Sequence, residues 1–176
     1  QGHTSAIYQD ADENWFYCYW GDKAVAVIGL PGIFTDASGR VTMKSLANFN
    51  AMLNKTLSNN GFSNITSDYT DATYVVGDFT ASLSAAYNDV DTAANHKNSD
   101  GTIKSLANGS KVYQGKNGAY SWNTNNCLDR TYESLSKGTL ANGMNAGTFM
   151  KDLGFKGGMI PNNAKPKFKE AFMNNS

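Results

Sequence analysis

The chain has few cysteines, few histidines and few prolines for its length. Its 176 residues contain two cysteines, two histidines and three prolines. Two cysteines cannot make a disulfide framework, and no closely spaced Cys or His pair of the kind that binds zinc is present. The sequence therefore predicts a domain that folds on its own hydrophobic core, with no metal and no other cofactor.

The chain also lacks an excess of charge of either sign and a long apolar run. Lys plus Arg and Asp plus Glu each number 15, which gives a formal net charge of zero and implies no polyanionic partner such as nucleic acid. The longest apolar run, Ala24 to Leu30, is far shorter than the ~20 residues of a membrane-spanning helix. We expect a single domain over residues 1–176, monomeric in solution, and cut or processed from a longer polypeptide because the first strand begins so close to Gln1.

Hydrophobic periodicity predicts a mixed α and β chain. Segments rich in β-branched and aromatic residues predict strands, and apolar residues at helical spacing predict helices. The predicted strands are 3–8 and 15–20, paired as a hairpin, then 24–29, 73–79 and 118–122. One predicted helix covers about 42–58, a second is capped by Thr80 or Ser82 and runs through Val90, and a third covers 127–135 and is ended by a Gly138 cap. The polar stretch 95–117 is expected to be a surface excursion.

Cys127 lies where a predicted strand meets a predicted helix. Asn125 or Asn126 would cap that helix. The unpaired N–H groups and the dipole at a helix N-terminus favour a thiolate and would lower the pKa of the Cys127 thiol. The same N–H groups could bind an oxyanion. Two alternatives stay open: Cys127 as a small buried side chain, or a disulfide between Cys127 and Cys18. Without that disulfide, we interpret Cys18 as a packing residue of the aromatic segment Trp15–Trp20.

Only His3 and His96 are available as a general base. His3 begins a strand, and a rigid element is the kind of placement that a catalytic base requires. His96 lies in a polar stretch that is typical of a solvated surface. We therefore favour His3.

The order of these motifs resembles a known family. Gly2-His3-Thr4 leads into an aromatic hairpin, and the segment Tyr120 to Cys127 leads into a helix, so the histidine strand precedes the cysteine helix. This order is similar to that of the circularly permuted papain-like hydrolases, the permuted branch of the NlpC/P60 superfamily. Gly77-Asp78-Phe79 and Ile160-Pro161-Asn162 further resemble domains at the C-termini of bacterial Rhs-like and secreted toxin proteins. The resemblance implies an α+β fold in which a small antiparallel sheet packs against several helices.

The resemblance also implies a reaction. It assigns Cys127 as the nucleophile and His3 as the general base and acid of an acyl transfer. The substrate that it implies is peptidoglycan, cut by an amidase or endopeptidase, and the protein would be a secreted antibacterial effector delivered to the periplasm of a target cell, with a cognate immunity protein. One alternative is a lipid- or ester-directed acyltransferase or hydrolase of the same fold. Another is a cell-surface binding module that presents the aromatic segment Trp15–Trp20.

The family usually has a third polar residue that orients the imidazole, and the register of the first hairpin decides which residue can take that place. If the turn centres on Asp12, Tyr19 lies diagonal to His3 on the same face of the sheet. A slip of one residue would bring Trp20 and Asp22 there instead. We expect Tyr19, with a backbone carbonyl or a water molecule as the alternatives.

Overall fold

The computed structural model describes residues 3–21, 25–30, 43–59, 68–72, 75–90, 112–115, 120–122, 125–152 and 154. This part of the chain has a mixed α+β fold with a small antiparallel sheet and four helices. In chain order the elements are β1 (Ala6–Gln9), β2 (Trp15–Trp20), β3 (Val25–Gly29), α1 (Met43–Asn59), β4 (Gly77–Asp78), α2 (Thr80–Val90), β5 (Val112–Gly115), α3 (Cys127–Leu135), β6 (Thr139–Leu140) and α4 (Ala146–Asp152).

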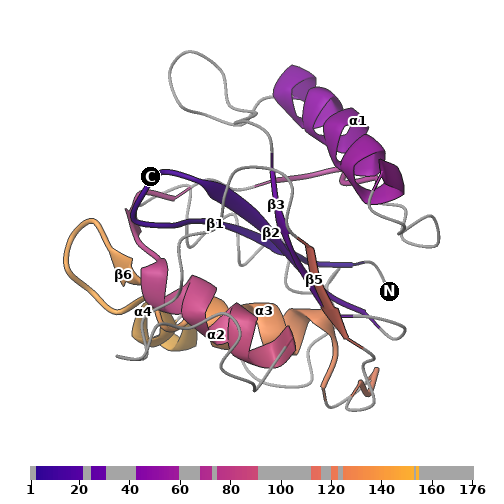
Figure 1. Cartoon of the computed structure of the whole chain (residues 1–176). Helices are drawn as coiled ribbons and strands as arrows, with labels where there is room; N and C mark the ends of the chain where they lie inside the picture. The colour runs from indigo at the N-terminus through magenta and orange to yellow at the C-terminus, as the bar shows by residue number, and fades with distance from the viewer. Residues whose placement is uncertain are drawn as a thin grey trace.

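The main sheet has the strand order β1-β2-β3-β5, and each neighbouring pair is antiparallel (Figure 1). Ala6 pairs with Cys18, which centres the first hairpin on Asp12, the register that favours Tyr19 over Trp20 and Asp22. The carboxylate of Asp10 shapes this turn by accepting the N–H groups of Asp12 at 2.9 Å and Asn14 at 2.8 Å. The turn chemistry of a single aspartate therefore sets the register that divides the hairpin side chains between the two faces of the sheet.

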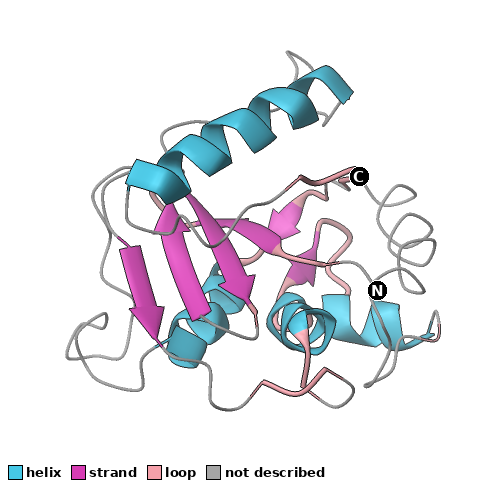
Figure 2. Cartoon of the chain, turned by 90° about the vertical axis from the view of Figure 1, so that its right-hand side faces the viewer, coloured by secondary structure: helices cyan, strands magenta, loops and turns pink. Residues whose placement is uncertain are grey.

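Both faces of this sheet are covered. Figures 1 and 2 show α1 on one side of the strands, and α2, α3 and α4 on the other. Alternate residues of the hairpin point to opposite faces, as the pleat of a strand requires. The α1 face carries Ile7, Trp15, Tyr17, Tyr19, Ala26, Ile28 and Leu30, packed against Leu46, Phe49, Leu53 and Leu57. The α2 face carries Ala6, Tyr8, Phe16, Cys18 and Val27, packed against Leu83, Ala86 and Tyr87.

The aromatic strand β2 lies inside this core rather than on a surface. Phe16 is 2% exposed, Tyr17 is 0% exposed and Trp20 is 9% exposed. Burial of large aromatic side chains contributes strongly to core stability. The aromatic face that a surface-binding module would need is therefore mostly covered by the protein itself.

A second sheet pairs β4 with β6 beside α3 and α4. Gly138, expected to cap α3, does not act as the cap: the helix ends at Leu135 with Ser136 as its C-cap. Gly138 instead allows the Phe79 ring to pack on the backbone, since a Cβ at position 138 would lie 2.2 Å from that ring. A close approach, and no left-handed turn, explains the glycine.

Three expectations about strands were wrong in part. Of the segment 73–79, only Gly77–Asp78 is a strand among the residues described. Within the expected surface excursion 95–117, Val112–Gly115 forms β5 and pairs with β3. Near the predicted strand 118–122, Ser121 makes only an isolated bridge to Asn125. Strand pairing through the backbone needs a neighbour, and sequence pattern alone does not show where that neighbour lies.

Two elements, β6 and α4, were not predicted at all. His96, Asp22, Gly2 and the motif Ile160-Pro161-Asn162 lie outside the described residues, so the expectations about them are not tested. The predicted helices agree closely with α1, α2 and α3. None of the described helices combines the length and apolar character that crossing a bilayer requires.

Candidate functional site

Cys127 is the first residue of α3, at a well-capped helix terminus. The Asn126 side chain accepts the Asp129 backbone N–H at 3.0 Å, and the Asp129 carboxylate accepts the Asn126 backbone N–H at 3.0 Å. This reciprocal capping box satisfies two of the N–H groups that a helix start leaves unpaired. The Asn126 amide also donates to the Trp122 carbonyl at 2.9 Å, and the Trp20 indole donates to the Asn125 carbonyl at 3.2 Å. The turn before Cys127 is thus tied to both the helix and the sheet.

The sulfur of Cys127 is enclosed by protein, and the residue is only 5% exposed. The backbone N–H groups of Thr4 and Leu128 point to it and favour the thiolate. Burial has the larger effect and raises the pKa of the Cys127 thiol above its ordinary value. The lowering expected from the helix N-terminus is therefore wrong in net direction, because water that would solvate the anion is excluded from this helix end.

Both cysteines are free thiols, so the disulfide alternative does not hold. Cys18 lies in the core cluster of the α2 face, as the packing interpretation predicted. Burial, with a smaller contribution from the nearby Asp89 carboxylate, strongly raises the pKa of the Cys18 thiol. Cys18 is consequently a neutral core thiol at physiological pH.

Thr4 joins the start of the first strand segment to α3. Its N–H points to the Cys127 sulfur, and its carbonyl accepts a long hydrogen bond of 3.4 Å from the Thr131 hydroxyl. In an antiparallel strand the N–H and C=O of one residue point to the same side. The two Thr4 contacts therefore place α3 along the open edge of the segment that leads into β1. His3 directly precedes Thr4, so the main chain of His3 lies close to Cys127.

The His3 ring lies among tyrosines on the α1 face. Its centroid is 5.0 Å from that of Tyr19 and 6.2 Å from that of Tyr69. Desolvation by these neighbours lowers the pKa of His3 to about 4. The residue as a whole is exposed, so solvent moderates the effect. The lowered pKa means that the imidazole is neutral at pH 7 and is a weaker base than a solvated histidine.

The structure brings His3 and Tyr19 together, since the predicted hairpin register places them diagonally on one face. Trp20 points to the opposite face, toward Arg130. The side-chain hydrogen bond of the His3 ring joins Nε2 and the Ser5 hydroxyl, 2.7 Å apart, and does not involve Cys127. His3 and Cys127 therefore approach each other through the Thr4 main chain, while their side chains make no hydrogen bond in this structure.

Ser5 is the polar neighbour of His3 that sequence reasoning missed. Its hydroxyl contacts His3 Nε2 and donates to the Tyr17 hydroxyl at 3.3 Å. Tyr17 in turn shares a 2.6 Å hydrogen bond with the Tyr69 hydroxyl. The spacing of two residues between His3 and Ser5 is the signal that could have found Ser5, because side chains two apart on a strand share a face.

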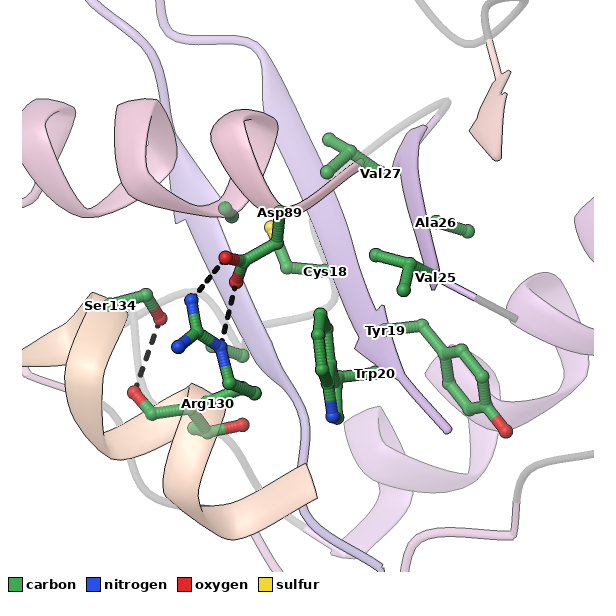
Figure 3. Close-up of a pocket in the computed structure, with 12 residues that line it drawn as sticks. Cys18, Tyr19, Trp20, Val25, Ala26, Val27, Asp89, Arg130 and Ser134 are labelled. Carbon is green, nitrogen blue, oxygen red and sulfur yellow. Dashed lines mark hydrogen bonds and ion pairs between the residues drawn. The ribbon is translucent and has the colours of Figure 1, made fainter. Parts of the chain in front are cut away.

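A small cavity lies on the other face of the sheet, between β2, α2 and α3 (Figure 3). Its volume of about 20 Å³ is space for about one water molecule. The Asp89 carboxylate and the Arg130 guanidinium point toward each other there, and Arg130 lies 5.1 Å from the Trp20 ring centroid. The guanidinium also binds Glu133 at 2.8 Å. Because the Arg130 guanidinium already binds two carboxylates and packs on an aromatic ring, we interpret Asp89 and Arg130 as a structural ion pair.

Neither Cys127 nor His3 lines this cavity. Figure 3 shows Tyr19 pointing away from the Asp89–Arg130 pair, toward the opposite face of the sheet. Within the described residues, no group of three His, Cys, Asp or Glu side chains is arranged to hold a metal ion. The chemistry available around Cys127 is thus that of a thiol, an imidazole, hydroxyls and backbone N–H groups.

Comparison with known proteins gave no match: no family model, no curated protein and no solved structure is significantly similar to this chain. The resemblance to permuted papain-like hydrolases rests on the short motifs around His3 and Cys127.

Proposed function

We propose that this protein is a cysteine hydrolase of permuted papain-like fold, with Cys127 as nucleophile, His3 as general base and acid, and Tyr19 packed on the imidazole. The observation that carries the proposal is the contact between the Thr4 N–H and the Cys127 sulfur at a capped helix terminus. It sets the main chain of the histidine segment against the cysteine. That juxtaposition is what the reversed order of the two motifs requires.

In this mechanism the thiol and the imidazole are both neutral before reaction, since burial raises the pKa of Cys127 and desolvation lowers that of His3. His3 takes the thiol proton as the sulfur attacks the carbonyl carbon, and the carbonyl oxygen becomes an oxyanion that backbone N–H groups can hold. Collapse expels the amine, which takes the proton from His3. Water, deprotonated by His3, then attacks the thioester and releases the acid and the thiol.

The substrate that we propose is peptidoglycan, cut at an amide bond of the stem peptide or cross-link. The protein would act as an effector in the periplasm of a target cell and would be blocked in the producing cell by an immunity protein. The test incubates purified sacculi with wild type, Cys127→Ala and Cys127→Ser and measures released muropeptides by mass spectrometry. Release by wild type alone is expected. If wild type releases none but hydrolyses a lipid ester, peptidoglycan is the wrong substrate and the lipid-directed alternative replaces it.

The pairing of Cys127 with His3 has its own test, which needs no substrate. Iodoacetamide modification of each cysteine is followed by peptide mass spectrometry in wild type and His3→Ala. If His3 acts as the base for Cys127, the alkylation rate of Cys127 should be lower in His3→Ala than in wild type by roughly tenfold or more, in line with general-base contributions. Cys18 lies on the other face of the sheet, so its rate is the internal control and should not change. Equal Cys127 rates in the two proteins would exclude the dyad.

A further inference from the structure

We infer that Ser5 is the positioning residue of His3: it accepts a hydrogen bond from Nε2–H and leaves Nδ1 as the nitrogen that takes up a proton. The role of Nδ1 in catalysis rests on the proposed function. The tautomer itself rests only on the hydrogen-bond network of the α1 face and can be measured without any turnover.

The direction of the hydrogen bonds follows from counting protons. A serine hydroxyl has one hydrogen to donate. The geometry of the contact between Ser5 and Tyr17 has the serine as donor, at 3.3 Å. At its 2.7 Å contact with His3 Nε2, Ser5 can then only accept, so His3 carries its proton on Nε2. The same count excludes Ser5 as a nucleophile activated by His3, since such a serine would donate to the imidazole.

The acceptor side of this network is anchored in the core. Tyr17 is 0% exposed, and its hydroxyl is 2.6 Å from that of Tyr69. The main chain of Tyr69 is held to α1 by Asn50, whose side chain donates to the Tyr69 carbonyl at 2.9 Å and accepts the Tyr69 N–H at 2.9 Å. A rotation of the His3 ring would break its bond to Ser5 and its packing on Tyr19. The imidazole is thus held at one nitrogen and on one face.

Covalent geometry then selects the other nitrogen. Nδ1 is the ring nitrogen nearer to the main chain, and the main chain next to His3 is where the Thr4 N–H meets the Cys127 sulfur. Nδ1 makes no hydrogen bond with any side chain that the structure describes. With Nε2 protonated, Nδ1 holds the lone pair of the neutral ring and is the nitrogen that remains to take up a proton.

The tautomer is tested by NMR on uniformly ¹⁵N-labelled protein at pH 7. A long-range ¹H–¹⁵N correlation spectrum distinguishes the protonated ring nitrogen from the unprotonated one. We expect the proton on Nε2 in wild type, and solvent exchange of that proton faster by about tenfold or more in Ser5→Ala, because its hydrogen bond is lost. Ser136→Ala removes a serine hydroxyl at the far end of α3 and should leave the exchange unchanged. A wild-type proton on Nδ1, or unchanged exchange in Ser5→Ala, overturns the inference.

A kinetic comparison on a peptidoglycan fragment tests the positioning role. Ser5→Ala should lower kcat by roughly 10- to 100-fold with little change in KM, as misplacement of a catalytic group does, and Ser5→Thr, which keeps the hydroxyl, should restore most of it. Full kcat in Ser5→Ala would refute the positioning role while leaving the proposed function intact. Full activity in Cys127→Ala would refute the proposed function while leaving the tautomer result intact.

Discussion

The two faces of the main sheet use their polar groups differently. On the α1 face, hydroxyls of Ser5, Tyr17 and Tyr69 form a neutral chain that ends at the His3 ring. On the α2 face, a charged pair, Asp89 with Arg130, lies beside the Cys18 thiol and the hydroxyl pair of Tyr8 and Ser134. A neutral chain orients its members through directed hydrogen bonds, whereas a half-buried ion pair mainly compensates the cost of its own desolvation.

This difference separates the histidine from both thiols. His3 shares a layer with hydroxyls that can fix its tautomer, and Cys18 lies on the opposite side of the same strands. Cys127 lies between these environments, at the open edge of the strand, where the Thr4 main chain contacts it. The main chain of the histidine segment therefore lies beside Cys127 at this edge of the sheet, while the His3 ring packs on the α1 face.

The largest expected effect comes from deleting a matched leucine on each face. Leu53→Ala removes a side chain that is 0% exposed on the α1 face, and Leu83→Ala one that is 2% exposed on the α2 face. Each should lower the free energy of unfolding by about 2–5 kcal/mol, the range for buried Leu→Ala changes. Urea denaturation followed by circular dichroism and tryptophan fluorescence measures it, with the exposed Lys55→Ala expected to change it by less than ~0.5 kcal/mol. Two separate transitions would show that the faces unfold independently.

The ion pair of the α2 face should respond next. Arg130→Met keeps most of the side-chain volume and leaves Asp89, whose side chain is 15% exposed, without its counter-charge. We expect a loss of about 2–3 kcal/mol, somewhat less than for a fully buried pair, because Arg130 is partly solvated. Adding Asp89→Asn should recover at least half of that loss. No recovery in the double variant would mean that Arg130 stabilises the fold through its packing on Trp20.

A smaller effect is expected at the buried hydroxyl pair of the same face. Tyr8 Oη and Ser134 Oγ are 2.7 Å apart, and burial raises the pKa of Tyr8 far above its ordinary value. Ser134→Ala leaves the Tyr8 hydroxyl buried without this partner and should cost about 1–2 kcal/mol. A double-mutant cycle with Tyr8→Phe should give a favourable coupling energy of at least ~0.5 kcal/mol. Strict additivity would indicate that the hydrogen bond is energetically neutral.

The smallest effect is the pH dependence contributed by His3. Its pKa is about 4 in the folded protein, against an ordinary value of 6.5, so the unfolded chain binds a proton first as pH falls. The contribution of His3 to stability is therefore complete above pH 6.5 and is lost between pH 6.5 and about 4. Solvent screening of this exposed residue keeps the change below ~1 kcal/mol. Wild type should lose stability relative to His3→Gln over this interval, and parallel curves would contradict the lowered pKa.

Local patterns predicted much of the architecture. The turn residues predicted the hairpin and narrowed its register to two alternatives, of which the structure has the one centred on Asp12. The pair Asn125-Asn126 before Cys127 predicted the start of α3, and Asn126 is the cap. These signals lie within a few residues of what they specify. The edge strand β5 was missed because its partner, β3, is more than 80 residues earlier in the chain, and its own sequence Val112–Gly115 is short and flanked by turn residues.

The candidate site, like the fold, was predictable only where it depends on residues close together in the sequence. Tyr19 could be placed beside His3 because the register of a single hairpin fixes the positions of the two residues. Ser5 shares that face by simple alternation, but its role depends on Tyr69, which belongs to a segment beyond α1 and is 52 positions away from Tyr17. Which group donates at each hydrogen bond of a chain can be decided only when every acceptor in the chain is known, and these acceptors come from distant parts of the sequence.

Short-range chemistry, readable from neighbouring residues, specified the first hairpin, the helices α1, α2 and α3, and the placement of Cys127 at a capped helix start. The proton chemistry depended instead on how distant segments pack together. Burial reversed the expected shift in the pKa of Cys127, and packing against tyrosines lowered that of His3. Capping and turn preferences are properties of neighbouring residues, whereas desolvation depends on which distant segments exclude water from a group.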